Sequence, residues 1–140
     1  MKIYFACSIT GGRDDEAAYQ AIVDVLQADG HDIPTAHLAK PDVISLEQTV
    51  DPGEVYTRDV AWINDSDAVI AEVSTPSHGV GYEIAYSLGI SKPVLCCYKQ
   101  GVKVSKMILG NSDPKLSVQA YTDINEAKQV VRSFIDQLTA

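Results

Sequence analysis

The sequence predicts an α/β fold in which helices cover both faces of a five-stranded parallel sheet. Two observations lead to this fold class. Short apolar runs alternate along the chain with segments of helical periodicity, the order typical of βα units. The length of 140 residues, 46% of them hydrophobic, suits one domain, and no repeat, low-complexity tract or linker divides residues 1–140. We therefore expect a single-domain sandwich of the flavodoxin-like or Rossmann-like type.

Five apolar runs predict the strands. They cover residues 2–7, 31–36, 68–73, 93–98 and 117–121. The second run is the weakest, because Pro34 lacks the amide that a strand residue donates. The carboxyl ends of parallel strands meet at one edge of a sheet, and the loops at that edge are where such sheets build ligand sites.

Helical segments fill the intervals between the strands. The expected helices cover residues 14–28, 53–66 and 82–88, a short stretch within 101–110, and a C-terminal segment from 123 onward. Asp14 and Asp123 are expected to cap the first and the last helix. Gly30 and Gly89 are expected to end the first and the third. Residues 38–52 are expected to form a longer loop, a kind of segment that often serves as a lid or a binding loop.

Composition narrows the function classes. A formal net charge of −8 argues against binding of a long nucleic acid, which requires a basic face, but it permits a small phosphate ligand held by backbone amides. No apolar run approaches the roughly 20 residues of a membrane span. The N-terminus lacks the pattern of a signal peptide, so a cytoplasmic protein is expected. Cys7, Cys96 and Cys97 lie in apolar runs and are interpreted as buried, reduced thiols, with a nucleophilic Cys7 as an alternative.

The stretch from the strand 68–73 into the helix 82–88 is the most informative part of the chain. A polar loop joins the two, and Ser77 together with the backbone amides at the helix start can hold an anion. Glu83 lies in the first turn of the expected helix and would face the same crevice. The alternative interpretation of Glu83 is a surface carboxylate stabilised by the helix dipole.

A second carboxylate lies on the helix 53–66. Asp59 shares a helix face with Val55 and Trp62, and a carboxylate on an apolar face is costly unless it is paired or used. The alternative to a functional role is a pairing with Arg58 or another cation. Two acids on separate helices near one crevice suit glycosidic chemistry, in which one attacks the anomeric carbon and the other assists the leaving group. That chemistry requires no metal and no cofactor.

The sequence lacks several other catalytic signatures. The turn over residues 8–13 is rich in glycine and hydroxyl groups, but it matches neither the dinucleotide fingerprint nor the Walker motif, and a plain strand–helix turn explains it equally well. His37 and His78 lie in different loops without a Cys/His cluster, so no metal site is expected. A G-x-S-x-G elbow is missing, which argues against a serine hydrolase.

Three segments together resemble the nucleoside 2-deoxyribosyltransferase superfamily, and most closely its hydrolytic branch, the 2′-deoxynucleoside 5′-monophosphate N-glycosidases. They are residues 4–13 (YFACSITGGR), 58–63 (RDVAWI) and 76–83 (PSHGVGYE). The resemblance extends over nearly the whole chain. The hydrolytic branch often carries Arg where this chain has Thr10, and Gly where it has Cys7.

The resemblance implies a role for each site residue. It implies that Glu83 is the nucleophile that forms a glycosyl-enzyme at C1′, that Asp59 helps the base to leave, and that Tyr4 orients the nucleophile. It further implies a homodimer in which Ser105 serves the 5′-phosphate site of the neighbouring subunit. The substrate-binding residues that it implies are Ser8, Ile9, Thr10, Gly12, Arg13, His37, Ser77, Gly79, Ser105 and Met107, with His37 on the side of the base.

The predicted function is hydrolysis of the N-glycosidic bond of (2′-deoxy)nucleoside 5′-monophosphates to free base and (deoxy)ribose 5-phosphate through a covalent intermediate on Glu83. The expected partner is a small nucleotide, without nucleic acid polymer or membrane. One alternative is a deoxyribosyltransferase, in which a second base intercepts the same intermediate. Another is a nucleotide-sensing domain without turnover, although a receiver domain would carry an acidic pair where this chain has Ser8-Ile9-Thr10. The motifs leave the base and the 2′-hydroxyl preference open.

Overall fold

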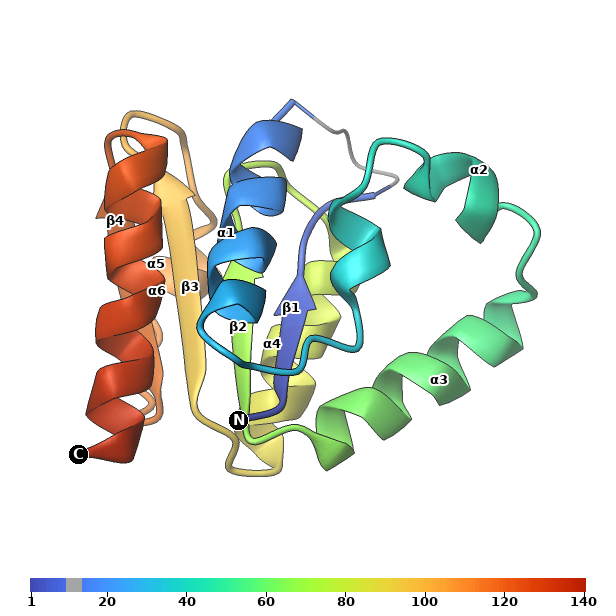
Figure 1. Cartoon of the computed structure of the whole chain (residues 1–140). Coiled ribbons are helices and arrows are strands. Elements are labelled where there is room, and N and C mark those ends of the chain that lie inside the picture. The colour runs from blue at the N-terminus through green and yellow to red at the C-terminus, as the bar shows by residue number, and fades with distance from the viewer. Residues whose placement is uncertain (10–13) are drawn as a thin grey trace.

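A parallel sheet forms the centre of the molecule (Figure 1). The computed structural model describes residues 1–9 and 14–140, and within them the sheet has four strands in the order β1-β2-β3-β4. The strands are β1 Ile3–Ala6, β2 Ala68–Glu72, β3 Val94–Lys99 and β4 Leu116–Tyr121. All neighbouring pairs are parallel. β1 and β2 are buried along their whole length, as expected for a sheet covered on both faces.

The predicted strand over residues 31–36 is wrong. What forms there is an isolated parallel bridge between Lys2 and Asp32. Pro34 has no amide to donate, and the hydroxyl of Thr35 instead donates to the Phe5 carbonyl at 2.8 Å and accepts from the Phe5 amide at 2.9 Å. One side chain therefore satisfies the part of the β1 edge that a fifth strand would have paired, and the chain continues into the 3₁₀ helix η1, Ala36–Ala39.

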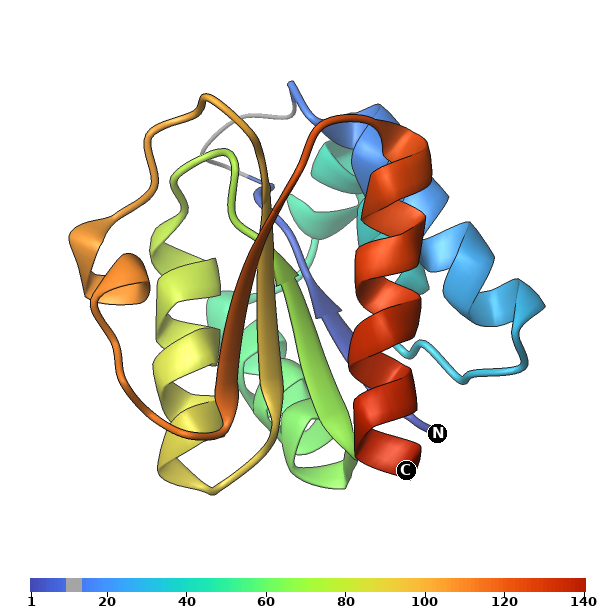
Figure 2. The same ribbon diagram turned by 90° about the vertical axis from the view of Figure 1, so that its left-hand side faces the viewer.

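Helices cover both faces of the sheet (Figures 1 and 2). Helices α1 (Glu16–Ala28) and α6 (Ile124–Thr139) share a core cluster with Ile3 and Phe5 of β1. Helices α3 (Pro52–Asp65) and α4 (His78–Gly89) share the other cluster with Tyr4 and Ala6. This alternation along β1 follows from the period of two in a strand, and it directs Tyr4 to the face covered by α3 and α4.

Helix ends agree closely with the predictions, apart from two corrections. Helix α4 begins at His78, four residues earlier than predicted, because the Ser77 hydroxyl caps it by accepting from the Val80 amide at 3.3 Å. Asp14 does not cap α1. The residue before that helix is Asp15, whose carboxylate accepts from the Thr75 hydroxyl at 2.9 Å and makes no cap hydrogen bond.

The predicted loop over residues 38–52 contains helical turns. Part of η1 and all of helix α2, Val43–Glu47, lie in it. In Figure 1 this segment leads from the side of β1 out to the start of α3. The short helix predicted within residues 101–110 is α5, Lys106–Leu109. In the described parts of the chain, no helix has the length and apolar character needed to span a membrane.

Candidate active site

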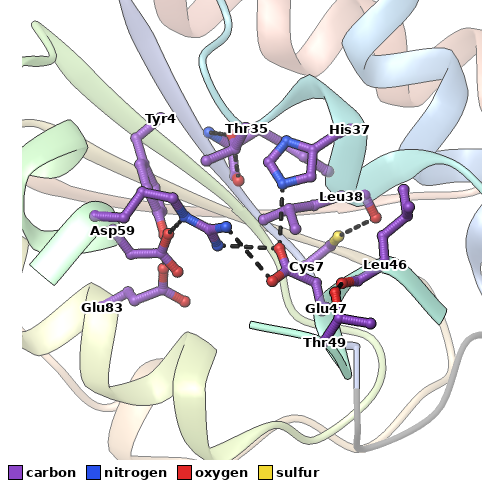
Figure 3. A network of polar contacts seen from close by, with 12 residues as sticks. Tyr4, Cys7, Thr35, His37, Leu38, Leu46, Glu47, Thr49, Asp59 and Glu83 are labelled. Carbon is purple, nitrogen blue, oxygen red and sulfur yellow. Dashed lines mark hydrogen bonds and ion pairs between the residues drawn. The ribbon is translucent and has the colours of Figure 1, made fainter. Parts of the chain in front are cut away.

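The two predicted carboxylates line one cavity. Asp59 comes from the middle of α3 and Glu83 from α4, and both border a cavity of about 560 Å³. Figure 3 shows the two side chains extending toward the same space, with Tyr4 behind them. The walls are mainly apolar, which favours exclusion of water from a bound ligand. The other described lining residues are Cys7, Ile9, Glu47, Val50, Pro52, Val55, Tyr56, Arg58, Val60, Ile63, Ser77, Gly79, Val80 and Tyr82.

Glu83 has an environment that disfavours its charge. Burial raises the pKa of Glu83 to about 8. The hydroxyl of Tyr4, a fully buried residue of β1, donates a hydrogen bond to Glu83 Oε2. That bond fixes the orientation of the carboxyl group and favours its ionised form. Gly79 lies beside this carboxyl group, and a Cβ atom added there would make an ordinary contact of 4.0 Å with Glu83 Oε1. A carboxylate held in this way suits a nucleophile that a substrate approaches from the cavity.

Asp59 lies beside a guanidinium group. Arg58 Nε donates to Asp59 Oδ1 at 2.8 Å. Burial raises the pKa of Asp59 above its usual value, and the hydrogen bond and charge of Arg58 oppose that shift. The pairing with Arg58 that the sequence left open as an alternative is therefore present, and Asp59 nevertheless borders the cavity. An acid with a raised pKa at this position can hold a proton for a leaving group.

Glu47 is a site residue that the sequence interpretation missed. It ends α2 and lines the cavity. Its carboxylate accepts from Arg58 at 3.0 and 3.4 Å and lies 3.1 Å from Nε2 of His37. His37 thus contacts a residue that lines the cavity. Its ring packs edge-on against the ring of Trp62, with 5.9 Å between the two ring centroids. No local motif marks Glu47, because its contacts are with residues 10 and 11 positions away along the chain, His37 and Arg58.

The N-terminus of α4 faces the cavity through Ser77 and Gly79. Backbone amides at such a position favour an anion. Ile9 also lines the cavity, whereas Ser8 is completely buried between the lining residues Cys7 and Ile9. The predicted residues Thr10, Gly12 and Arg13 lie outside the described residues.

Ser105 and Met107 lie apart from this cavity. Ser105 is exposed and caps α5 by accepting from the Met107 amide at 3.2 Å, and Met107 is 84% exposed. Their neighbour Val104 belongs to the core cluster that α4 shares, and Ile108 packs against that cluster. Neither Ser105 nor Met107 is among the described residues that line the cavity.

Potential metal ligands and thiols are further candidates for a role at the cavity in the parts of the chain that the structure describes. Over residues 1–9 and 14–140 there is no group of three or more His, Cys, Asp or Glu that could hold a metal ion. Cys7 lines the cavity, and its Sγ donates to the Leu38 carbonyl at 3.5 Å. A nucleophilic Cys7, the alternative that the sequence left open, requires the thiolate and stays a prediction.

Comparisons with known proteins find relatives over nearly the whole chain. The chain is 40% identical over 134 residues, 96% of this chain and 84% of the relative, to a protein of Methanosarcina barkeri named as a 2′-deoxynucleoside 5′-phosphate N-hydrolase. It is 37% identical over 149 residues to the 5-hydroxymethyl-dUMP N-hydrolase of Danio rerio, with 99% of both chains covered.

Structural similarity extends to more distant proteins. The CMP N-glycosidase BcmB of Clostridium botulinum superposes with a TM-score of 0.74 at 15% identity, over 96% of this chain and 99% of that one, which shows a shared fold. The family model described as nucleoside 2-deoxyribosyltransferase matches residues 3–133. The chain therefore belongs to the nucleoside 2-deoxyribosyltransferase family.

Proposed function

We propose that this protein hydrolyses the N-glycosidic bond of (2′-deoxy)nucleoside 5′-monophosphates, releasing a free base and (deoxy)ribose 5-phosphate. The observation that carries the proposal is the pair of partly buried carboxyl groups, Asp59 and Glu83, on neighbouring helices around one cavity. The relatives with 37% and 40% identity, named as hydrolases of this bond type, support it over nearly the whole chain.

The first half of the reaction uses both carboxyl groups. An ionised Glu83 oxygen attacks C1′, the C1′–N bond breaks, and its electron pair goes to the base nitrogen. Asp59 gives its proton to the departing base. Burial raises the pKa of Glu83 to about 8 and also raises the pKa of Asp59, where Arg58 opposes the rise. The reaction as proposed uses the form with the proton on Asp59 and the charge on Glu83, and the Tyr4 hydroxyl stabilises that charge.

The second half restores the enzyme. Water attacks C1′ of the glycosyl ester while Asp59, now ionised, takes one of its protons. The bond between C1′ and the Glu83 oxygen breaks, and Glu83 is again an ionised carboxylate. The sum is addition of one water across the C1′–N bond, with both side chains returned to their starting protonation states.

The 5′-phosphate is proposed to bind at the start of α4. Ser77 and Gly79 offer the helix N-terminus there, and Ser8, Ile9, Thr10, Gly12 and Arg13 come from the segment after β1. His37, beside Glu47, is proposed to lie on the side of the base.

A homodimer is proposed to complete the site, with Ser105 and Met107 of one subunit near the phosphate of the other. The supporting observation is the exposure of apolar side chains on α5, where Met107 is 84% and Leu109 51% exposed. Light scattering at the concentration of the activity assay checks this: a dimer is expected, and a fully active monomer would reject it.

Base transfer is the second candidate, because the matching family model describes deoxyribosyltransferases. Hydrolysis and transfer share the glycosyl intermediate and differ in whether water or a second base attacks it. The deciding experiment incubates the protein with a panel of deoxyribo- and ribonucleoside 5′-monophosphates and follows free base by chromatography. Base release without an acceptor supports hydrolysis. Exchange that requires an added base supports transfer, and no product from any substrate would reject both.

A further inference from the structure

We propose that Arg58 positions Asp59 for proton delivery and that Glu47 positions Arg58, so that neither residue acts on substrate directly but both determine how efficiently the base leaves. This inference rests on the proposed function, in which Asp59 protonates the departing base. It concerns two residues for which the sequence alone indicated no catalytic task.

The contact between Arg58 and Asp59 is unusual for adjacent residues of a helix. Successive side chains on a helix point about 100° apart and do not face each other. Arg58 nevertheless reaches Asp59 Oδ1 through its Nε at 2.8 Å. That position therefore needs other contacts to hold it.

Two groups hold the guanidinium in place. The carboxylate of Glu47 accepts from both terminal nitrogens of Arg58, at 3.0 Å from Nη2 and 3.4 Å from Nη1, which is a fork-to-fork pairing. The ring of Trp62 lies under the guanidinium carbon at 4.9 Å from its centroid. All three nitrogens of Arg58 are thus engaged, two by Glu47 and one by Asp59.

Partial burial makes these contacts stronger than surface ion pairs. The side chains of Glu47, Arg58 and Asp59 are 13%, 25% and 19% exposed. Charge-assisted hydrogen bonds with bidentate geometry are more directional and stronger than exposed pairs, which contribute little. Nε2 of His37 lies 3.1 Å from Oε1 of Glu47, so Glu47 is held by His37 as well as by Arg58.

The chemical consequence concerns the two oxygens of Asp59. Arg58 occupies Oδ1, so the proton for the leaving base is carried on Oδ2. A carboxyl group that could rotate freely would present either oxygen, and proton transfer depends on the alignment of donor and acceptor. Glu47 lies one step further away, since it contacts Arg58 and not Asp59 in the contacts that the structure records.

The test separates proton delivery from folding. Glu47→Gln and Arg58→Gln are compared with wild type on two substrates: a natural deoxynucleoside 5′-monophosphate and a 2-deoxyribose 5-phosphate carrying a 4-nitrophenolate leaving group at C1′. The second leaving group departs as a stable anion and needs no proton. Arg132→Gln is the matched control, because Arg132 pairs with Asp29 through two nitrogens, at 2.7 and 2.8 Å, on the α1–α6 face.

The expected result is a selective defect. Both site variants should lose about tenfold or more in kcat on the natural substrate, a fraction of what general acid catalysis contributes, with KM changed by less than about threefold. On the activated substrate, the pre-steady-state release of 4-nitrophenolate reports the first half of the reaction and not the later attack of water that Asp59 assists. That release should stay within about threefold of wild type, and the control should match wild type on both substrates. Arg58→Lys, which keeps the charge but not the fork, should recover only part of the loss.

Two outcomes overturn the inference. If a site variant loses the same factor in the first-turnover release of the natural base and in the first-turnover release of 4-nitrophenolate, it acts through structure or binding and not through proton delivery. If a site variant keeps wild-type kcat on the natural substrate, it has no positioning role. Failure of the proposed function looks different, because wild type itself would then release no base from natural nucleotides.

Discussion

Two buried glutamates lie near the same edge of the sheet, on opposite faces. Burial raises the pKa of Glu83 to about 8 and the pKa of Glu72 to about 7. Glu83 lies on the α3–α4 face, borders the cavity and accepts from the Tyr4 hydroxyl. Glu72 ends β2 with no exposed surface, among groups of the α1–α6 face, and its Oε1 accepts from the Ser74 amide at 2.7 Å.

The comparison separates a raised pKa from a catalytic role. Both carboxyl groups are perturbed for the same reason, loss of water around the charge. What distinguishes Glu83 is access, because a substrate in the cavity can approach it, whereas Glu72 has no exposed surface. A perturbed carboxyl group is thus a candidate nucleophile only where a ligand can reach it.

The largest expected effect is on Glu83. Glu83→Ala should remove turnover, because loss of a covalent nucleophile usually costs several orders of magnitude in rate. Glu72→Gln should keep the wild-type rate. Single-turnover assays on both purified variants check this contrast. A Glu83→Ala rate within a few-fold of wild type would show that the nucleophile is another group.

Asp59→Asn should cause the next largest loss, about 10²- to 10⁴-fold, because an amide keeps the shape of the side chain but cannot give a proton to the base. Substrate affinity should change much less. The check is a single-turnover rate measured beside a binding titration with the same nucleotide. Equal rates in the variant and wild type would leave Asp59 with the purely structural pairing to Arg58 that the sequence allowed.

How far the sequence could predict this site differs between its parts. Asp59 and Glu83 could be found because helical periodicity and the strand–loop–helix order place each on a helix beside the same sheet edge. Glu47 could not, since α2 carries no strong periodic pattern and its approach to Arg58 is a tertiary contact. The same limit explains the strand predicted over residues 31–36, which does not form. Pro34 made that strand the weakest of the five predictions, but only the structure shows that the Thr35 hydroxyl bonds to the backbone of Phe5 at the edge of β1.

Removal of the 5′-phosphate from the substrate is expected to lower kcat/KM by a smaller factor than either Glu83→Ala or Asp59→Asn. 5′-Monophosphates should be turned over at least about tenfold more efficiently than the matching nucleosides, a difference of roughly 1.4 kcal/mol in transition-state binding. The α4 N-terminus beside Glu83 supplies donors that a neutral hydroxymethyl group would not need. The assay compares kcat/KM for dGMP with deoxyguanosine, and for dCMP with deoxycytidine, at fixed ionic strength.

Ser77→Ala should reduce the ratio of kcat/KM for the 5′-monophosphate to kcat/KM for the matching nucleoside. An unchanged ratio would mean that the phosphate binds elsewhere, and nucleosides that equal their monophosphates would move the protein to the transferase branch.

The smallest effect on turnover, and a clear one on stability, is expected for Glu72. Its folded pKa of about 7 lies above its ordinary value of 4.5, so the folded state binds more protons between these pH values and the free energy of unfolding falls as pH rises through that window. Glu72→Gln should remove this loss, which is on the order of 3 kcal/mol. Urea unfolding at pH 5 and pH 8 measures it. If the stability difference between variant and wild type is the same at both pH values, Glu72 does not titrate in this window.

The most direct test of the account is identification of the group that carries the sugar. Wild-type protein is mixed with a deoxynucleoside 5′-monophosphate, quenched in acid within the first turnover, digested and analysed by mass spectrometry. The account predicts a deoxyribose 5-phosphate adduct on the peptide that contains Glu83, absent from Glu83→Ala and present in Glu72→Gln. An adduct on another residue, or full turnover by Glu83→Ala without any adduct, would contradict it.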